Sequence, residues 1–175
     1  MKELQGKVAV ITGAASGIGR ALARRCATED MKVVLADVEQ APLDKTEREL
    51  REAGAAVLAV QADVSRARDV ERIARETLDE FGAVHLLVNN AGVSLIGPPV
   101  WETTPADWDW ILGVNLRGVV HGLRVFVPIM LEQATPCHIV NTTSPAGLLA
   151  LPAFGAYNAS KAGIVAVSET LQRVS

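Results

Sequence analysis

Residues 8–19 read Val-Ala-Val-Ile-Thr-Gly-Ala-Ala-Ser-Gly-Ile-Gly, and this stretch decides the fold. Its first four residues are a continuous aliphatic run, typical of a strand buried on both faces of a parallel sheet. Gly13, Gly17 and Gly19 follow, and a helical pattern begins at Gly17. Because glycines lack side chains, backbone N–H groups and the positive end of the helix can approach a pyrophosphate. A glycine cluster can also be only a tight turn, but the strand before it and the helix after it favour a dinucleotide site.

Outward from this stretch, aliphatic runs alternate with segments of helical period. Strands joined by helices form right-handed βαβ units. We therefore predict an α/β fold, a Rossmann-like doubly wound parallel sheet with ligands at the carboxyl ends of its strands. Ser65 is expected to cap the third helix, and Thr104 with Pro105 to begin the fourth. The predicted strands are Val8–Thr12, Val33–Asp37, Ala56–Gln61, Leu86–Asn90 and His138–Thr142, and the predicted helices are Gly17–Glu29, Pro42–Ala53, Ala67–Phe81, Pro105–Glu132 and Gly155 to the chain end.

The composition is typical of a soluble α/β protein, and the charge favours a small-molecule partner. The 175 residues are 49% hydrophobic and 21% charged, which fits one domain, 1–175, with an aliphatic core. The net charge of -3 without a basic run argues against a nucleic-acid partner. Residues 1–7 lack the apolar stretch of a signal peptide, and the widely separated Cys26 and Cys137 are expected to be buried free thiols of a reducing compartment. We therefore expect a cytoplasmic protein.

Metal sites and membrane spans are not expected. His85, His121 and His138 have no metal-ligand spacing. The apolar segment Ile111–Leu131 is interrupted by polar residues that a membrane helix would have to bury, namely Asn115, Arg117, His121 and Arg124. The three tryptophans near the start of the long helix could line the substrate side, although packing is their commoner role; they are Trp101, Trp108 and Trp110.

Asp37 ends the second predicted strand, 18 residues after Gly19. At that place a carboxylate can accept hydrogen bonds from the adenosine ribose hydroxyls and repels a 2′-phosphate. Ala14, Ala15 and Ser16 offer no cation for such a phosphate, so NAD is preferred over NADP. The alternative is that Asp37 only starts a turn, as acids after strands often do.

Tyr157 and Lys161 are four residues apart on the last predicted helix and share one face. Tyrosine is a weak base at neutral pH, and a nearby ammonium group favours its ionised form. The pair can therefore exchange a proton with an alcohol or carbonyl oxygen. Such pairs also occur by chance on solvated helices, but this is the only tyrosine of the chain, and Asn141–Ser144 place hydroxyl groups upstream of it.

Three motifs together resemble the short-chain dehydrogenase/reductase family, in its NAD-dependent one-domain branch, over essentially the whole chain. Residues 12–19 are similar to its TGxxxGxG turn, residues 89–92 to its NNAG motif and residues 157–161 to its YxxxK motif. The three-residue gap between Gly13 and Gly17 departs from GxGxxG and matches this family. A nucleotide-sugar epimerase also carries YxxxK, but this turn and the short chain argue against it.

The resemblance implies a site and a reaction. It implies the strand order 3-2-1-4-5 and reversible hydride transfer between a nicotinamide and a secondary alcohol or ketone. Tyr157 would be the acid/base, Ser144 would hydrogen-bond the substrate oxygen, Lys161 would assist Tyr157 and hold the nicotinamide ribose, and Asn115 would position a water. The resemblance also implies cofactor contacts at Gly13, Ser16, Gly17, Ile18, Gly19, Asp37, Asp63, Val64, Asn90, Ala91, Gly92, Tyr157 and Lys161.

Family members continue beyond the YxxxK helix with two strands and a substrate lid, which we expect to be absent here. The outer edge of the fifth strand would then be open. The alternative function is a truncated, non-catalytic dinucleotide-binding homologue. A homo-oligomer, dimer or tetramer, is also expected, with apolar positions on the two last helices at its interface, namely Val119, Leu123, Ile164 and Val167.

Overall fold

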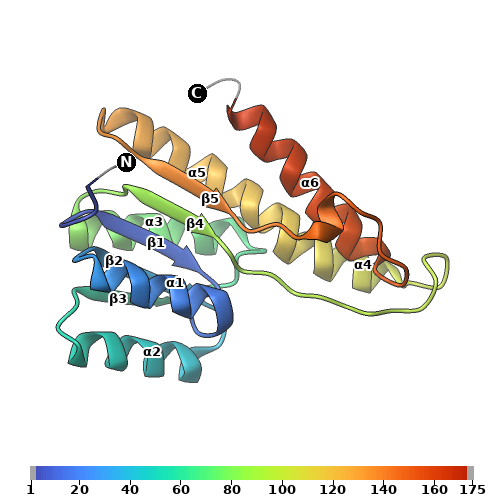
Figure 1. Cartoon of the computed structure of the whole chain (residues 1–175), viewed down its shortest axis with the longest axis horizontal. Helices are drawn as coiled ribbons and strands as arrows, with labels where there is room; N and C mark the ends of the chain where they lie inside the picture. Colours follow the sequence, from blue (N-terminus) through green and yellow to red (C-terminus); the bar gives the residue numbers. More distant parts are fainter. Residues whose placement is uncertain (1–2, 173–175) are drawn as a thin grey trace.

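The protein is a five-stranded parallel sheet covered by helices on both faces, in a computed structural model that describes residues 3–172 (Figure 1). The sheet order is β3-β2-β1-β4-β5, as predicted, and all four strand pairs are parallel. The strands are β1 (Val8–Thr12), β2 (Lys32–Asp37), β3 (Val57–Gln61), β4 (Leu86–Asn89) and β5 (His138–Asn141). The helices are α1 (Gly17–Thr28), α2 (Gln40–Glu52), α3 (Ala67–Phe81), α4 (Pro105–Leu112), η1 (Gly113–Arg117), α5 (Gly118–Glu132), η2 (Pro145–Gly147) and α6 (Gly155–Gln172).

Two hydrophobic cores lie on the two faces of the sheet, because successive strand residues point to opposite faces. On one face, Val8 and Val10 of β1 pack with residues of α3 and α5, including Phe126. On the other, Ala9 and Ile11 pack with residues of α1 and α2. Both faces of β1 are therefore buried, which explains its continuous aliphatic sequence.

The predicted helix Pro105–Glu132 is continuous but not uniformly α-helical. Residues Gly113–Arg117 form η1, a π-helical turn between α4 and α5. Thr104 caps α4 through a reciprocal pair of hydrogen bonds with Asp107, as predicted for its start. By length and composition alone this helix is also apolar enough to span a membrane, but its residues Phe126 and Met130 lie in the core against the sheet.

Three expectations were wrong. Ser65 does not cap α3: the cap residue is Arg66, and the Ser65 hydroxyl instead donates to Asp63 Oδ1 at 2.7 Å. Cys26 is buried, but Cys137 is only half-buried because it lies in the turn between α5 and β5. Two of the four residues expected at an oligomer interface, Val119 and Ile164, are buried inside this chain and so cannot reach a partner.

Candidate active site

The glycine turn leaves the first turn of α1 open. Gly13 and Gly17 have positive φ angles of 66° and 49°, which glycine adopts without strain. A Cβ at Gly19 would lie 2.0 Å from the Gly13 carbonyl oxygen, so only glycine fits there. Ser16 is the cap residue of α1, but its side chain makes no cap hydrogen bond. The Ser16 hydroxyl and the first N–H groups of α1 are therefore available to an anion.

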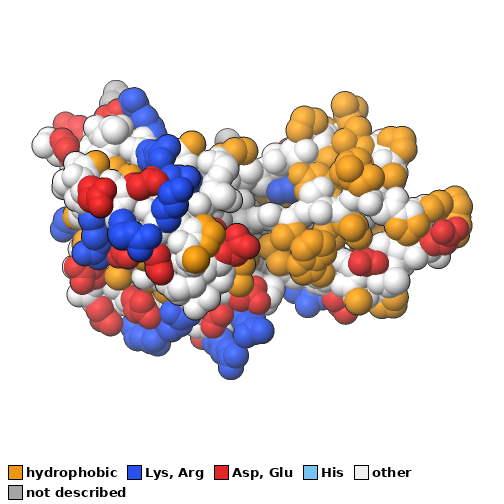
Figure 2. Space-filling view, turned by 90° about the horizontal axis from the view of Figure 1, so that it is seen from below, with side chains coloured by type: hydrophobic (Ala, Val, Ile, Leu, Met, Phe, Trp, Pro, Cys, Tyr) orange, Lys and Arg blue, Asp and Glu red, His pale blue; other side chains and the backbone are white. Residues whose placement is uncertain are grey.

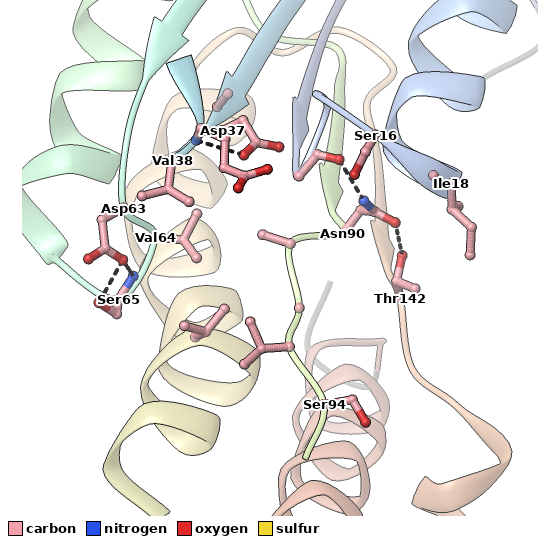
Figure 3. Close-up of a pocket in the computed structure, with 18 of the residues that line it drawn as sticks. Ser16, Ile18, Asp37, Val38, Asp63, Val64, Ser65, Asn90, Ser94 and Thr142 are labelled. Atoms are coloured by element: carbon pink, nitrogen blue, oxygen red, sulfur yellow. Dashed lines mark hydrogen bonds between the residues drawn. The ribbon is translucent and has the colours of Figure 1, made fainter. Parts of the chain in front are cut away.

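Thr12 and Asn90 join β1 to the segment after β4. The Thr12 hydroxyl accepts the backbone N–H groups of Asn90 at 3.0 Å and Ala91 at 3.1 Å. The Asn90 amide donates to the Thr12 carbonyl at 3.0 Å and accepts from the Thr142 hydroxyl at 3.3 Å. Figure 3 shows Asn90 between Ser16 and Thr142 at the wall of the pocket. This network fixes the carboxyl ends of β1, β4 and β5 relative to one another.

Asp37 ties the end of β2 to the glycine turn. Its Oδ2 accepts the Ala15 N–H at 2.9 Å, and its Oδ1 accepts the Glu39 N–H at 3.1 Å. The second bond closes the kind of turn that acids form after strands. Asp37 therefore does start a turn, as the alternative proposed. The same carboxylate also lines the pocket. Asp37 is thus held in place by two N–H groups while it faces the pocket (Figure 3).

Tyr157 and Lys161 lie where α6 meets the pocket. The Lys161 ammonium donates to the Thr142 carbonyl at 3.0 Å and lies over the Tyr157 ring, 5.6 Å from its centroid. The lysine is only 4% exposed, and this burial lowers the pKa of the Lys161 ammonium below its usual value. The pair is therefore held together, with the cation against the tyrosine ring and anchored to the end of β5.

Asn115 occupies the π-helical turn η1 and is fully buried. Its Oδ1 accepts the Val93 N–H at 2.8 Å, and its Nδ2 donates to the Val93 carbonyl at 2.9 Å and to the Ser160 hydroxyl at 3.0 Å. Ser160 in turn donates to the Tyr157 carbonyl at 2.7 Å. Asn115 therefore connects the segment after β4 to the turn of α6 that carries Tyr157. Sequence reasoning gave Ser160 no role, although it stands inside the YxxxK motif.

One continuous cavity of about 780 Å³ connects these groups. It extends from Asp37 and Asp63 past the glycine turn to Tyr157 and Lys161. Its volume lies within the usual range of pockets for small molecules and cofactors. Of the expected cofactor contacts, the cavity is lined by Gly13, Ser16, Gly17, Ile18, Asp37, Asp63, Val64, Asn90, Ala91, Gly92, Tyr157 and Lys161.

Three expected residues and one group of tryptophans need separate mention. Gly19, Asn115 and Ser144 do not line the cavity. Ser144 precedes η2, and its hydroxyl accepts the Ala146 N–H at 3.2 Å, so its own hydrogen is free to be donated. Trp110 lines the cavity, whereas Trp101 is 81% exposed. Within residues 3–172 no group of three His, Cys, Asp or Glu side chains is placed to hold a metal.

The family match and the most similar relatives agree with one another. The family described as short chain dehydrogenase matches residues 7–174. A CLA biosynthesis dehydrogenase/reductase of Lactiplantibacillus plantarum is 38% identical over 97% of this chain and 59% of that protein. A 1-deoxy-11-beta-hydroxypentalenate dehydrogenase of Streptomyces exfoliatus is 39% identical over 97% of this chain and 62% of that protein.

A solved structure gives the same result. The crystal structure of a short chain dehydrogenase/reductase from Burkholderia phymatum in complex with NAD has 54% sequence identity and a TM-score of 0.96. The match covers 98% of this chain and 60% of that one. The chain thus spans about 60% of the length of these relatives.

Proposed function

The chain belongs to the short-chain dehydrogenase family, and on that premise we propose that its cavity binds NAD and catalyses hydride transfer between the nicotinamide and a secondary alcohol or ketone. One observation carries the proposal: a single cavity joins the open glycine turn and Asp37 at one end to the Tyr157–Lys161 pair at the other. A dinucleotide needs a phosphate site and a ribose acceptor at a fixed separation from the reacting centre, and this cavity supports that placement.

The residues present fit this cofactor. The first turn of α1 offers free N–H groups and the Ser16 hydroxyl to a pyrophosphate. Asp37 would accept the adenosine ribose hydroxyls and disfavour a 2′-phosphate, which supports NAD over NADP. Val64 and Ala91 would contact the adenine end of the cofactor. Lys161, beside Tyr157, would hold the nicotinamide ribose.

A bound nicotinamide supplies the acceptor or donor of the hydride. In oxidation, the hydrogen on the alcohol carbon would leave as a hydride, with the electron pair of the C–H bond, the O–H proton would move to the Tyr157 phenolic oxygen, and the carbon and oxygen would form a carbonyl. In reduction, Tyr157 returns the proton to the oxygen. The buried Lys161 ammonium lies over the Tyr157 ring, 5.6 Å from its centroid, where it would stabilise charge that develops during the proton transfer.

Two further residues would position the reacting groups. Ser144 does not line the cavity itself, but its hydroxyl hydrogen would be available to a substrate oxygen on which charge develops. Asn115 uses both amide hydrogens and one Oδ1 lone pair for protein contacts. The remaining Oδ1 lone pair can hold a water, but its main effect would be to fix the helix turn below Tyr157.

The experiment measures NADH formation from a panel of secondary alcohols by this chain and by Tyr157→Phe, which removes only the hydroxyl. General acid–base catalysis contributes about 10²- to 10⁴-fold, so Tyr157→Phe should lose activity by that factor while its affinity for NAD, measured by calorimetry, stays within about twofold. Activity that survives in Tyr157→Phe would refute the mechanism. NAD binding without NADH formation in the unaltered chain would favour the alternative of a non-catalytic dinucleotide-binding module.

A further inference from the structure

Large apolar side chains are exposed at the carboxyl end of the sheet, next to the cavity. They come from two loops, the one between β4 and α4 and the one between β5 and α6. Figure 2 shows hydrophobic side chains gathered over the part of the molecule that contains α4, α6 and these loops, whereas most charged side chains crowd the other part. We call this surface the apolar mouth, and it consists of Ile96, Val100, Trp101, Leu148, Leu149 and Leu151.

The two loops form one surface that adjoins Tyr157. The Gly97 N–H donates to the Ala153 carbonyl at 3.0 Å, so the loops are bonded to each other. Val100 packs so closely on Gly155, the first residue of α6, that a Cβ there would lie 2.8 Å from it. The Phe154 ring lies 5.9 Å from the Tyr157 ring, centroid to centroid. The six mouth residues do not line the cavity themselves, but both loops reach it, one through Val93 and Ser94 and the other through Thr143, so the apolar mouth adjoins the end of the cavity that contains Tyr157.

The same loops carry a single charged residue, Glu102, which follows Trp101. Residues 93–101 and 142–160 contain no Asp, Glu, Lys or Arg. Lys161, the nearest cation in the sequence, is buried and bonded to Thr142. An anionic group on a substrate would lose hydration at this surface without gaining a counter-charge, and Glu102 would repel it. An apolar group would instead bury its own surface together with that of the exposed side chains.

We propose that the substrate is a neutral secondary alcohol or ketone with an apolar body of several carbon atoms, which lies on the apolar mouth while its oxygen faces Tyr157. This inference rests on the proposed hydride transfer and adds the class of substrate. The continuity of the mouth with the Tyr157 end of the cavity favours the substrate as its occupant over a second copy of the chain.

The test is a ladder of alcohols that differ only in apolar length: 2-butanol, 2-hexanol and 2-octanol with NAD. Each methylene that becomes buried should raise kcat/KM about fourfold. The matched charged probe is 7-hydroxyoctanoate, which is 2-octanol with its far methyl group replaced by a carboxylate. Its kcat/KM should lie about tenfold or more below that of 2-octanol. The proposal is overturned if kcat/KM does not rise with chain length (a flat ladder), or if 7-hydroxyoctanoate has the same kcat/KM as 2-octanol.

Surface variants assign the effect to the mouth. Trp101 and Leu148 are 81% and 78% exposed, and Leu131, on α5, is 70% exposed. Trp101→Ser and Leu148→Ser should flatten the ladder but leave kcat/KM for 2-butanol within about twofold, since a short alcohol leaves little surface to bury there. Leu131→Ser is the matched control and should leave the ladder steep. An equal loss in the control overturns the assignment, as does a steep ladder in both mouth variants.

The inference and the proposed function fail in different ways. If the function fails, no alcohol, including 2-butanol, gives NADH that depends on Tyr157. Calorimetric binding of 2-butanone, 2-hexanone and 2-octanone to the NADH-loaded chain then still measures the ladder, and equal affinities overturn the inference. If two copies cover the mouth instead, Leu148→Lys lowers the mass in sedimentation while the ladder stays flat, which also overturns it.

Discussion

The Thr12 hydroxyl is predicted to be a main link between the carboxyl end of β1 and the segment that follows β4. The perturbation is Thr12→Val, which exchanges the hydroxyl for a methyl group of nearly the same shape. It removes the acceptor of the Asn90 and Ala91 N–H groups and the donor to the Val88 carbonyl at 3.4 Å. The side chain is buried, so water cannot readily replace the lost contacts.

The magnitude follows from the two N–H groups. A buried donor without a partner costs about 1–3 kcal/mol. Asn90 and Ala91 are half-buried, which places each donor at the low end of that range, so the free energy of unfolding should fall by about 2 kcal/mol. With a urea m-value of about 2 kcal/mol/M, the unfolding midpoint should fall by about 1 M.

The matched variant is Thr12→Ser, which keeps the hydroxyl and removes only the methyl group, at a cost of about 0.8 kcal/mol. The assay is urea unfolding of the three proteins, followed by calorimetric NAD titration in the absence of urea. NAD affinity should fall in Thr12→Val more than in Thr12→Ser, because the released 90–92 segment lines the cavity. The reasoning is refuted if Val is as stable as Thr, or if Ser and Val lose stability equally.

Three other outcomes can be measured on the same chain. The His85 Nδ1 accepts the Val8 N–H at 3.1 Å, and burial is the main cause that lowers the pKa of His85 below its ordinary value of 6.5. The stability that neutral His85 contributes is therefore complete above pH 6.5 and is lost as the pH falls through the folded-state pKa. Below pH 6.5 the urea midpoint should decline less for His85→Asn than for the unaltered chain. Gly19→Ala should abolish NAD binding and destabilise the fold more than Gly113→Ala, whose added Cβ would come no closer than 3.6 Å to another side chain, and equal midpoints would contradict the steric argument. Asp37→Asn should shift the ratio of NADP to NAD affinity about tenfold or more toward NADP, since a charge that repels the 2′-phosphate is removed; an unchanged ratio would mean that Asp37 acts only as a turn residue.

The parts of the site that were predicted from the sequence are those with a local cause. The glycine turn and the open first turn of α1 follow from which residues stand between β1 and α1. Tyr157 and Lys161 share a helix face because they are four residues apart. The family resemblance added Asp63 and Asn115, whose own neighbourhoods gave no distinctive signal.

The parts that were missed or wrong depend on residues far apart in the chain. The hydrogen bond from the Ala15 N–H to Asp37 joins the glycine turn to the end of β2. Asn115, in the π-helical turn, bonds to Val93 and Ser160, which are distant from it in the sequence. Ser65 stands where a helix cap is common, yet Asp63 takes its hydroxyl hydrogen. No local pattern distinguishes these outcomes from their alternatives.

By itself, the sequence determined the order of strands and helices, the parallel sheet and the open glycine turn. The reason is that the burial of a strand on both faces, and the conformations open to glycine, depend on short stretches of neighbouring residues. Only the tertiary structure decided what Thr12 and Ser160 bind, where the Lys161 ammonium lies and which apolar residues remain exposed beside Tyr157. The physical reason is that a hydrogen bond or a buried surface needs both partners in contact, and the chain brings those partners together only after the sheet has formed.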